Sequence, residues 1–265
     1  MIKTILITGL DGSGKSTLFS KLEEAKLPHV QLISALHVAI DTLPDTSILK
    51  EPVVLLNAMH QEADATDSSD LKAIALFCAM VLFEKLVSER TTESTRIILC
   101  ERHPLIDTFA YAQFYIPRLS SGNTNFEQLF YFATKYESLF AFILEQLPIE
   151  NKEAGVLAIY KFIKSFFVSK TSPDAETEAV FKTSVPDHIF FLKAPPEVLM
   201  ERISTRKVIE AHEKLSVLSD LSATYDTLFK EIETNYTTTT IEKVDASTFT
   251  SLDTFYTRLL TEMIP

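Results

Sequence analysis

Apolar, often β-branched residues form short runs along the chain, and several runs have the length of one buried strand. A strand buried on both faces shows about 4–8 consecutive apolar residues bounded by turn signals. Residues 2–8, 95–101, 187–193 and 241–245 fit this description. We expect a fifth strand between His29 and Lys50, in a segment where the pattern does not fix its boundaries.

Segments with apolar residues at a helical period separate these runs. They cover residues 16–25, 70–89, 105–114, 126–146, 155–169, 197–207, 213–235 and 251–263. Strands alternating with helices predict an α/β fold whose parallel sheet is covered on both faces, within a single domain over 1–265. The polar, turn-rich stretches 120–125 and 170–184 are expected to be surface loops, the second of them an insertion.

Composition and charge narrow the possible partners. The 265 residues include 36 acidic and 25 basic side chains, for a formal net charge of −11. A nucleic-acid partner is not expected, since its binding needs a basic surface that displaces counterions. No apolar run approaches the roughly 20 residues of a membrane span, and no signal peptide is apparent. Cys78 and Cys100 stand inside apolar runs, as buried thiols do, so we expect a cytoplasmic protein with no membrane partner.

The first predicted strand runs into a glycine-rich segment that matches the phosphate-binding pattern G-x-x-x-x-G-K-[ST]. Residues 9–16 read Gly-Leu-Asp-Gly-Ser-Gly-Lys-Ser, and a predicted helix follows. Glycines let the backbone N–H groups wrap closely around a polyphosphate. Lys15 adds a positive charge for the β- and γ-phosphates, and the Ser16 hydroxyl is a ligand for Mg²⁺. The expected ATP contacts are Asp11, Gly12, Ser13, Gly14, Lys15, Ser16 and Thr17.

This motif predicts the P-loop NTPase fold, a three-layer αβα sandwich around a parallel sheet of about five strands, with ATP and Mg²⁺ as cofactors. The guanine-reading pattern N-K-x-D is missing from the sequence, and D-x-x-G does not occur outside the phosphate-binding segment itself, so no separate switch motif is present. Their absence favours the small-molecule kinases over the GTPases.

A second polar group stands at the end of the strand predicted over 95–101. Glu101 and Arg102 open the sequence Glu-Arg-His-Pro at that point. Ligands of open α/β sheets gather at the carboxyl ends of the strands, so both side chains are expected near the phosphate loop. Glu101 would support Mg²⁺ or accept a proton, and Arg102 would neutralise a transferred phosphoryl group.

Residues 101–112 (ERHPLIDTFAYA) resemble the D/E-R-S/H segment of deoxynucleoside kinases, and their "RHP" resembles herpesvirus-type thymidine kinases. Lys50-Glu51-Pro52-Val53 resembles the Glu-Pro segment of that family. Residues 187–207 resemble its late strand and arginine-bearing lid helix. Residues 9–17 (GLDGSGKST) and 244–247 (VDAS) look closer to thymidylate kinases, a sister family.

The resemblance implies roles for individual residues. Glu51 would accept the proton of the substrate 5′-hydroxyl, and Tyr111 would lie against the base. Arg202 and Arg206, in a lid over about 196–213, would close over the ATP phosphates. These two arginines are four residues apart and so share one helix face, which is consistent with a common anion.

The base-binding positions depart from the family pattern. On the helix over 71–85, Phe77 and Cys78 stand in the base-binding region, and Cys78 replaces the family's glutamine. Asp107 matches an acid that accepts from a base amino group in some members, although it also suits the start of a helix. With Lys85 as a donor, Asp107 favours a base with an exocyclic amino group, adenine or cytosine, over thymine.

Three functions remain open from the sequence. The first is ATP-dependent phosphorylation of a (deoxy)nucleoside 5′-hydroxyl, which needs a base such as Glu51. The second is a nucleoside monophosphate kinase like thymidylate kinase, which needs extra cations instead, for which Lys50 is available. The third is a nucleotide-binding protein that no longer catalyses. The expected partner is a small-molecule nucleoside or nucleotide, with a homodimer left open.

Overall fold

Five parallel strands form one sheet, as the sequence predicted, and their order is β2-β3-β1-β4-β5. The computed structural model describes residues 2–66, 68–120, 125–152, 155–205 and 214–264. The strands are β1 (Lys3–Gly9), β2 (Val30–Ser34), β3 (Ile97–Glu101), β4 (His188–Lys193) and β5 (Thr240–Asp245). The expected P-loop architecture is therefore confirmed at the level of the fold.

Strand β1 lies at the centre of the sheet, hydrogen-bonded to β3 on one side and β4 on the other. The register pairs Ile7 with Glu101 and Gly9 with Leu192, so the three strands end at the same edge. The chain leaves β1 toward β2 on one side of the sheet, and it leaves β3 toward β4 on the other side. The switch point, where such sheets bind ligands, therefore lies between the carboxyl ends of β1 and β3.

The chain divides into two compact units, which are described separately. Unit 1 comprises residues 1–34, 91–103 and 185–265, and unit 2 comprises residues 35–90 and 104–184. All five strands belong to unit 1. Unit 2 is thus built from the two segments that follow β2 and β3 in the sequence.

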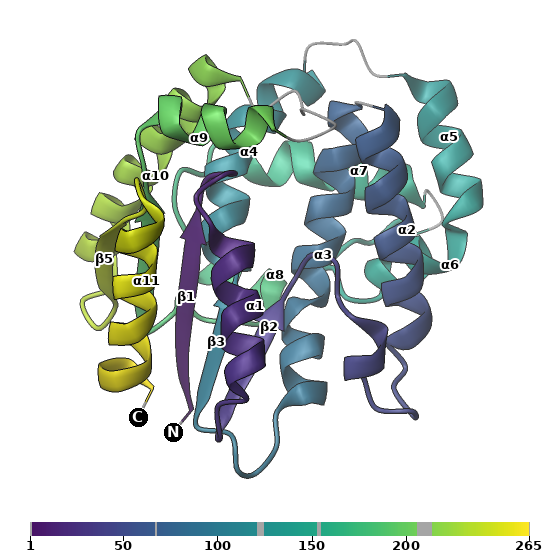
Figure 1. Ribbon diagram of the computed structural model, residues 1–265. Helices are drawn as coiled ribbons and strands as arrows, with labels where there is room; N and C mark the ends of the chain where they lie inside the picture. The colour runs from purple at the N-terminus through teal and green to yellow at the C-terminus, as the bar shows by residue number, and fades with distance from the viewer. Residues whose placement is uncertain (1, 67, 121–124, 153–154, 206–213, 265) are drawn as a thin grey trace. The chain divides into compact units, whose positions relative to one another are not determined.

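Helices cover both faces of the sheet in unit 1. They are α1 (Lys15–Ala25), α9 (Pro196–Ser204), α10 (Leu215–Asn235) and α11 (Phe249–Arg258), which continues into the π-helical turn η3 (Leu259–Met263). Adjacent residues of β4 mark the two faces, because successive side chains of a strand point to opposite sides. Phe190 packs against Phe255 of α11, whereas Phe191 packs against Tyr225 of α10. Figure 1 shows α1 and α11 side by side on one face of the sheet.

Unit 2 is helical. It comprises the short 3₁₀ turn η1 (Ile40–Thr42) and α2 (Lys50–Thr66), α3 (Ser69–Arg90), α4 (Pro104–Ser120), α5 (Phe126–Lys135), α6 (Glu137–Leu144), α7 (Val156–Phe167) and α8 (Ala175–Phe181). Helix α3 packs against α2, α4, α6, α7 and α8. Its apolar residues point in every direction around the axis, as expected of a helix enclosed by others.

Three parts of unit 2 differ from the sequence prediction. Helix α2 was not expected; Pro52 lies in its first turn, where proline is tolerated because the N–H groups there have no helical acceptor. Residues 170–184 are not wholly a surface loop. They include α8, which begins with a capping box between Asp174 and Thr177 and buries Phe181.

The single helix predicted over 126–146 is two helices. Tyr136 ends α5 and precedes α6, with φ −114° and ψ 29°, outside the helical region. Its hydroxyl donates to Glu62 of α2 at 2.7 Å. In the described part of the chain, no helix combines the length and hydropathy that crossing a bilayer requires.

Candidate active site

The loop after β1 is shaped by glycines with left-handed backbone angles. Gly12 has φ 80° and Gly14 has φ 94°, a region that side chains disfavour. A Cβ atom at Gly12 would also lie 2.9 Å from the carbonyl oxygen of Leu199, so space excludes a side chain there. Gly14 caps α1, and the N–H of Leu18 donates to its carbonyl at 3.0 Å. The first N–H groups of α1 therefore meet the loop directly, an arrangement that favours an anion.

Lys15 extends along the loop rather than into solvent. Its ammonium Nζ donates to the carbonyl oxygens of Gly9 at 2.8 Å and Leu10 at 2.9 Å. It also lies 3.9 Å from Asp11 Oδ1, and its side chain is only 5% exposed. The positive charge expected for ATP is thus held at the phosphate loop and shielded from water.

The remaining loop residues differ in exposure. Ser13 is fully buried, and its hydroxyl has no hydrogen-bond partner among the described residues. Thr17 lies exposed in the first turn of α1. Ser13 is thus placed to shape the loop from inside, while the Thr17 side chain is open to a ligand.

Ser16 and Glu101, the two residues expected at the metal, lie in contact. Ser16 Oγ donates to Glu101 Oε1 at 3.1 Å. A hydroxyl and a carboxylate oxygen are hard ligands of the kind that Mg²⁺ prefers, usually alongside water and phosphate oxygens. The donor atoms present at the start of α1 and the end of β3 therefore fit a magnesium ion.

Arg102 follows Glu101 and turns toward the same loop. Its Nη2 donates to Asp11 Oδ1 at 3.1 Å, and the two side chains are 11% and 16% exposed. The backbone of Arg102 is left-handed, with φ 67°, an uncommon angle for a residue with a side chain. Strained backbone of this kind clusters at functional sites in proteins.

His103, the next residue, is fully buried. Burial lowers its pKa to about 3, because the charged imidazolium would lose its hydration. The ring is therefore neutral near pH 7 and supplies no charge to the site.

Arg202 belongs to α9, the helix that follows β4, and its side chain contacts the phosphate loop. Its guanidinium donates to the carbonyls of Gly12 at 3.1 Å, Ala246 at 2.9 Å and Ser247 at 2.9 Å. It also lies 5.3 Å from the centre of the exposed Phe249 ring. Arg202 thereby joins the phosphate loop to the segment between β5 and α11. Arg206, its expected companion, lies outside the described residues, and the lid expected over 196–213 is described only as far as 205.

Asp245, at the end of β5, organises that segment. Its carboxylate accepts from the N–H of Ser247 at 2.9 Å and from the hydroxyl of Ser251 at 2.8 Å. Hydrogen bonds from Ser247 and then Ser251 lower the pKa of Asp245. The acid therefore stays ionised and fixes the carbonyl of Ser247 that Arg202 binds.

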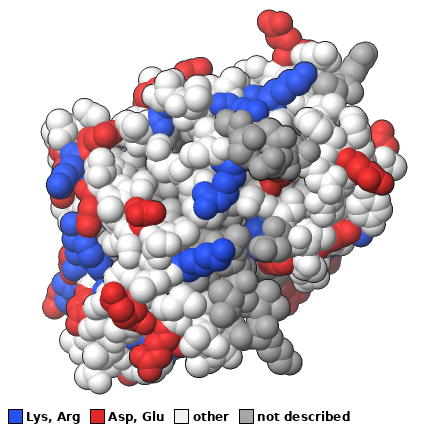
Figure 2. All heavy atoms as spheres, turned by 90° about the horizontal axis from the view of Figure 1, so that it is seen from above, with Lys and Arg blue, Asp and Glu red and all other residues white. Residues whose placement is uncertain are grey.

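Figure 2 views the structure from the side on which the strands end. Acidic and basic side chains are interspersed on this face. The positive groups at the phosphate loop therefore act locally, against a chain whose net charge is negative.

In unit 2, Glu51 stands in the first turn of α2 and is exposed. The neighbouring Lys50, the cation considered for a monophosphate, pairs with Asp45 at 2.7 Å. Glu51 is thus open to solvent and Lys50 is half-buried, and the expected roles of these two residues remain predictions.

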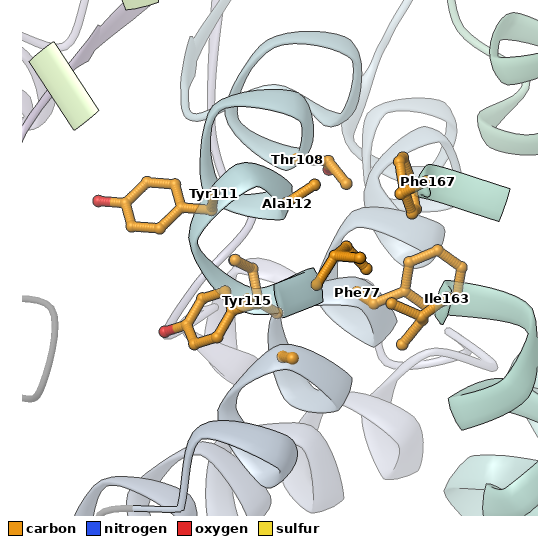
Figure 3. Close-up of a pocket in the computed structure, with 10 residues that line it drawn as sticks. Phe77, Thr108, Tyr111, Ala112, Tyr115, Ile163 and Phe167 are labelled. Carbon is orange, nitrogen blue, oxygen red and sulfur yellow. The ribbon is translucent and has the colours of Figure 1, made fainter. Parts of the chain in front are cut away.

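Phe77 and Tyr111 come together at one pocket of unit 2, lined by α3, α4 and α7 (Figure 3). The pocket is half open, and the space of about 310 Å³ within it includes open solvent. Its lining is Ala73, Leu76, Phe77, Thr108, Tyr111, Ala112, Tyr115, Ile116, Ile163 and Phe167. Aromatic and aliphatic side chains dominate this wall, as in sites that take a flat organic ring.

Two other residues expected at the base are not part of this lining. Cys78 and Asp107 are fully buried, and burial raises the pKa of the Cys78 thiol so that it stays protonated. Lys85, the expected donor, lies 5.7 Å from the ring centre of Phe142. Neither Asp107 nor Lys85 lines this pocket, and their expected roles toward the base remain predictions.

Some residues at the loop and the pocket have contacts that the sequence analysis did not predict. Asp11 is expected to contact ATP, which remains a prediction, and its carboxylate also accepts a hydrogen bond from Arg102. Thr108 and Tyr115 at the pocket lie three residues before and four residues after Tyr111, so the sequence spacing alone places them on the same face of α4. Phe249 carried no signal beyond an exposed aromatic residue near a helix start.

The fold is similar to that of a solved thymidylate kinase from Candida albicans. The two chains are 16% identical, with a TM-score of 0.51 over 99% of this chain and 92% of the other. No protein-family model and no curated protein matches the sequence. At this level of identity the similarity shows the fold.

Proposed function

We propose that the chain is an ATP-dependent nucleotide kinase whose acceptor is a nucleoside monophosphate. The observation that carries the proposal is the grouping of Lys15, Arg102 and the Ser16–Glu101 pair at one phosphate loop. Phosphoryl transfer depends mainly on positioning and on neutralising charge, which such a group supplies. The fold shared with a thymidylate kinase supports the same acceptor class.

Each residue has a defined part in this reaction. The phosphorus–oxygen bond to the γ-phosphoryl group breaks, ADP leaves with the electron pair, and an oxygen of the acceptor phosphate bonds to the phosphorus. Lys15 and the N–H groups of the loop would hold the β- and γ-phosphates. Arg102 would neutralise the transferring group. Magnesium, held through Ser16 and Glu101, would supply further charge neutralisation when bound.

The acceptor's base would contact Phe77 and Tyr111. Both side chains line one pocket of unit 2, and aromatic rings are the surfaces against which a nucleobase packs. An acceptor phosphate is already an anion, so the reaction needs no residue that removes a proton. This is the chemical difference from the second candidate, a nucleoside kinase.

A nucleoside kinase keeps one observation in its favour. Glu51 is an exposed carboxylate in the first turn of α2. It lies in the segment that resembles the Glu-Pro segment of deoxynucleoside kinases, where the resemblance implies a catalytic base. If a nucleoside is the acceptor, Glu51→Gln lowers turnover by roughly 10²–10⁴, as for a lost general base. If a monophosphate is the acceptor, the same change has little effect.

The test is an ATP-consumption assay over a panel of nucleosides and their monophosphates, including thymidine, deoxycytidine and deoxyadenosine. We expect turnover with one or more monophosphates and much less with every nucleoside. A preference for nucleosides would overturn the acceptor class. Tight ATP binding with no turnover on any acceptor would indicate a nucleotide-binding protein that does not catalyse.

A further inference from the structure

The pair formed by Asp11 and Arg102 joins the phosphate loop to the end of β3. The two residues are 91 positions apart in sequence, yet Nη2 of the arginine and Oδ1 of the aspartate are 3.1 Å apart. Both side chains are largely shielded from water, at 16% and 11% exposure. A charge-assisted hydrogen bond is stronger in such a setting than at an exposed surface.

The backbone of Arg102 fixes where its side chain begins, but not where its guanidinium group lies. The left-handed angle, φ 67°, costs about 1–2 kcal/mol for a residue with a side chain. β3 fixes the preceding residue in the sheet, and His103 is fully buried after it. The chain thus holds the Cα of Arg102 in a strained position, and the long side chain still has several rotatable bonds.

A carboxylate in a phosphate loop is electrostatically unfavourable unless another interaction offsets its negative charge. The position of Asp11 is one of the four variable positions of the motif, so the loop does not require an acid there. A carboxylate repels the polyphosphate that the loop is built to bind. The Asp11 carboxylate lies beside two cations, Arg102 at 3.1 Å and Lys15 at 3.9 Å, and it offsets part of that repulsion by holding them at the loop.

We propose that Asp11 is a positioning residue that fixes the Arg102 guanidinium beside the phosphate loop. Arg102 then meets the transferring phosphoryl group in one orientation, with its side-chain entropy already lost on folding. This inference rests on the proposed kinase function and deepens it. It assigns Asp11 to Arg102 rather than to ATP.

A double-mutant cycle in turnover tests the proposal. We expect Asp11→Ala to lower kcat by about 10- to 100-fold, with the KM for ATP changed less than about threefold. In an Arg102→Ala background, Asp11→Ala has almost no further effect, since its target is gone. Asp11→Asn, which keeps an acceptor oxygen at the same place, falls between wild type and Asp11→Ala. The control is Asp253→Ala, which removes an exposed acid that pairs with Lys21 of α1.

Two results would overturn the proposal. An equal loss from Asp11→Ala in both backgrounds would mean that Asp11 acts without Arg102, as a residue in direct contact with the acceptor does. A loss confined to the KM for ATP would mean that Asp11 only shapes the ATP site.

Thermal unfolding gives a readout that needs no turnover. Removing either partner leaves the other charge buried, so each single variant loses about 2–4 °C or more in Tm, and the double variant loses no more than the larger single loss. Additive shifts would contradict the pair. If the wild type binds ATP but turns over no acceptor, the kinase proposal fails, while the melting cycle still shows whether Asp11 holds Arg102.

Discussion

The Ser16 hydroxyl donates to the Glu101 carboxylate across 85 residues of sequence, at 3.1 Å. The parallel register makes this possible, because β1 and β3 end together and α1 starts one loop beyond β1. The contact is thus a property of the sheet edge, and it brings two oxygen ligands to the phosphate loop.

We predict that Ser16→Ala raises the Mg²⁺ concentration needed for half-maximal turnover by about tenfold or more, because one hard ligand is lost. Glu101→Gln should act in the same direction, and the double variant should be little worse than the stronger single change. Chelation of Mg²⁺ should stop transfer by the wild type, and added Mg²⁺ should restore it. Ser20→Ala, one turn later on the exposed side of α1, is the control. An unchanged Mg²⁺ dependence in Ser16→Ala would remove this residue from the metal site.

Lys15→Ala should reduce turnover at least a thousandfold, since a shielded charge-assisted contact to a transferring phosphoryl group contributes several kcal/mol. Lys21→Ala removes a partly exposed lysine from the same helix and should retain turnover. Initial rates at saturating ATP and acceptor provide the comparison. More than about a tenth of wild-type turnover in Lys15→Ala would rule out the phosphate loop as the catalytic site.

Gly12→Ala should lower both Tm and ATP affinity. The new methyl group would meet the Leu199 carbonyl at 2.9 Å, in addition to the strain of φ 80°. Gly155→Ala is a matched control, with φ 54° and no atom within 4 Å of its Cβ position. The backbone of Gly155, with φ 54° and ψ −128°, also disfavours a side chain, so this variant carries backbone strain without the collision. Equal losses of Tm in the two variants would show that the loop yields to the methyl group.

The buried His103 predicts a pH dependence of stability. Its folded pKa is about 3, below the value of about 6.5 in an unfolded chain. Between these values the unfolded state binds one more proton, so the free energy of unfolding falls as the pH falls below about 6.5. The slope approaches 1.4 kcal/mol per pH unit at most.

His103→Asn should flatten the decline in stability between pH 7 and pH 5, measured by urea unfolding. Because the variant removes packing as well, its absolute stability is not the readout; the difference in slope is. In the wild type, the C2 proton of His103 should also fail to titrate by NMR down to pH 5. A normal titration near pH 6.5 would contradict the buried, neutral ring.

Much of the fold follows from local patterns in the sequence. Four strands and the phosphate loop are short segments whose own residues determine their conformation, so the sequence pattern locates them. The pattern did not locate β2, which was expected only somewhere between His29 and Lys50. Helix α8 also carried a local signal, the Asp174–Thr177 capping box, hidden within a polar stretch. Helix α2 shows apolar residues at helical spacing, Val53, Leu56 and Ala63. A proline is unfavourable inside a helix, however, so the pattern indicates a helix here only if the helix begins close to Pro52.

The base pocket was less accessible to sequence reasoning. Phe77 and Cys78 are consecutive on α3, and α3 is apolar all round, so periodicity does not indicate which side of the helix faces the pocket. Packing against α4 and α7 decides it: Phe77 lines the pocket, and Cys78 is enclosed. The Arg202 contacts join three separate segments of chain, and no pattern within one segment specifies such a set.

The two carbonyl bonds of Lys15 have a thermodynamic consequence for ATP binding. An ammonium in water must shed its hydration before it can grip a phosphate, and that shedding weakens the net gain. At 5% exposure, Lys15 has already given up its water when the chain folds. In the proposed reaction, ATP binding would then be an exchange, in which phosphate oxygens replace the oxygens of Gly9 and Leu10 around a charge that is already shielded from water. Lys15 would therefore favour an anion that offers at least two suitably spaced oxygens over one that offers a single oxygen.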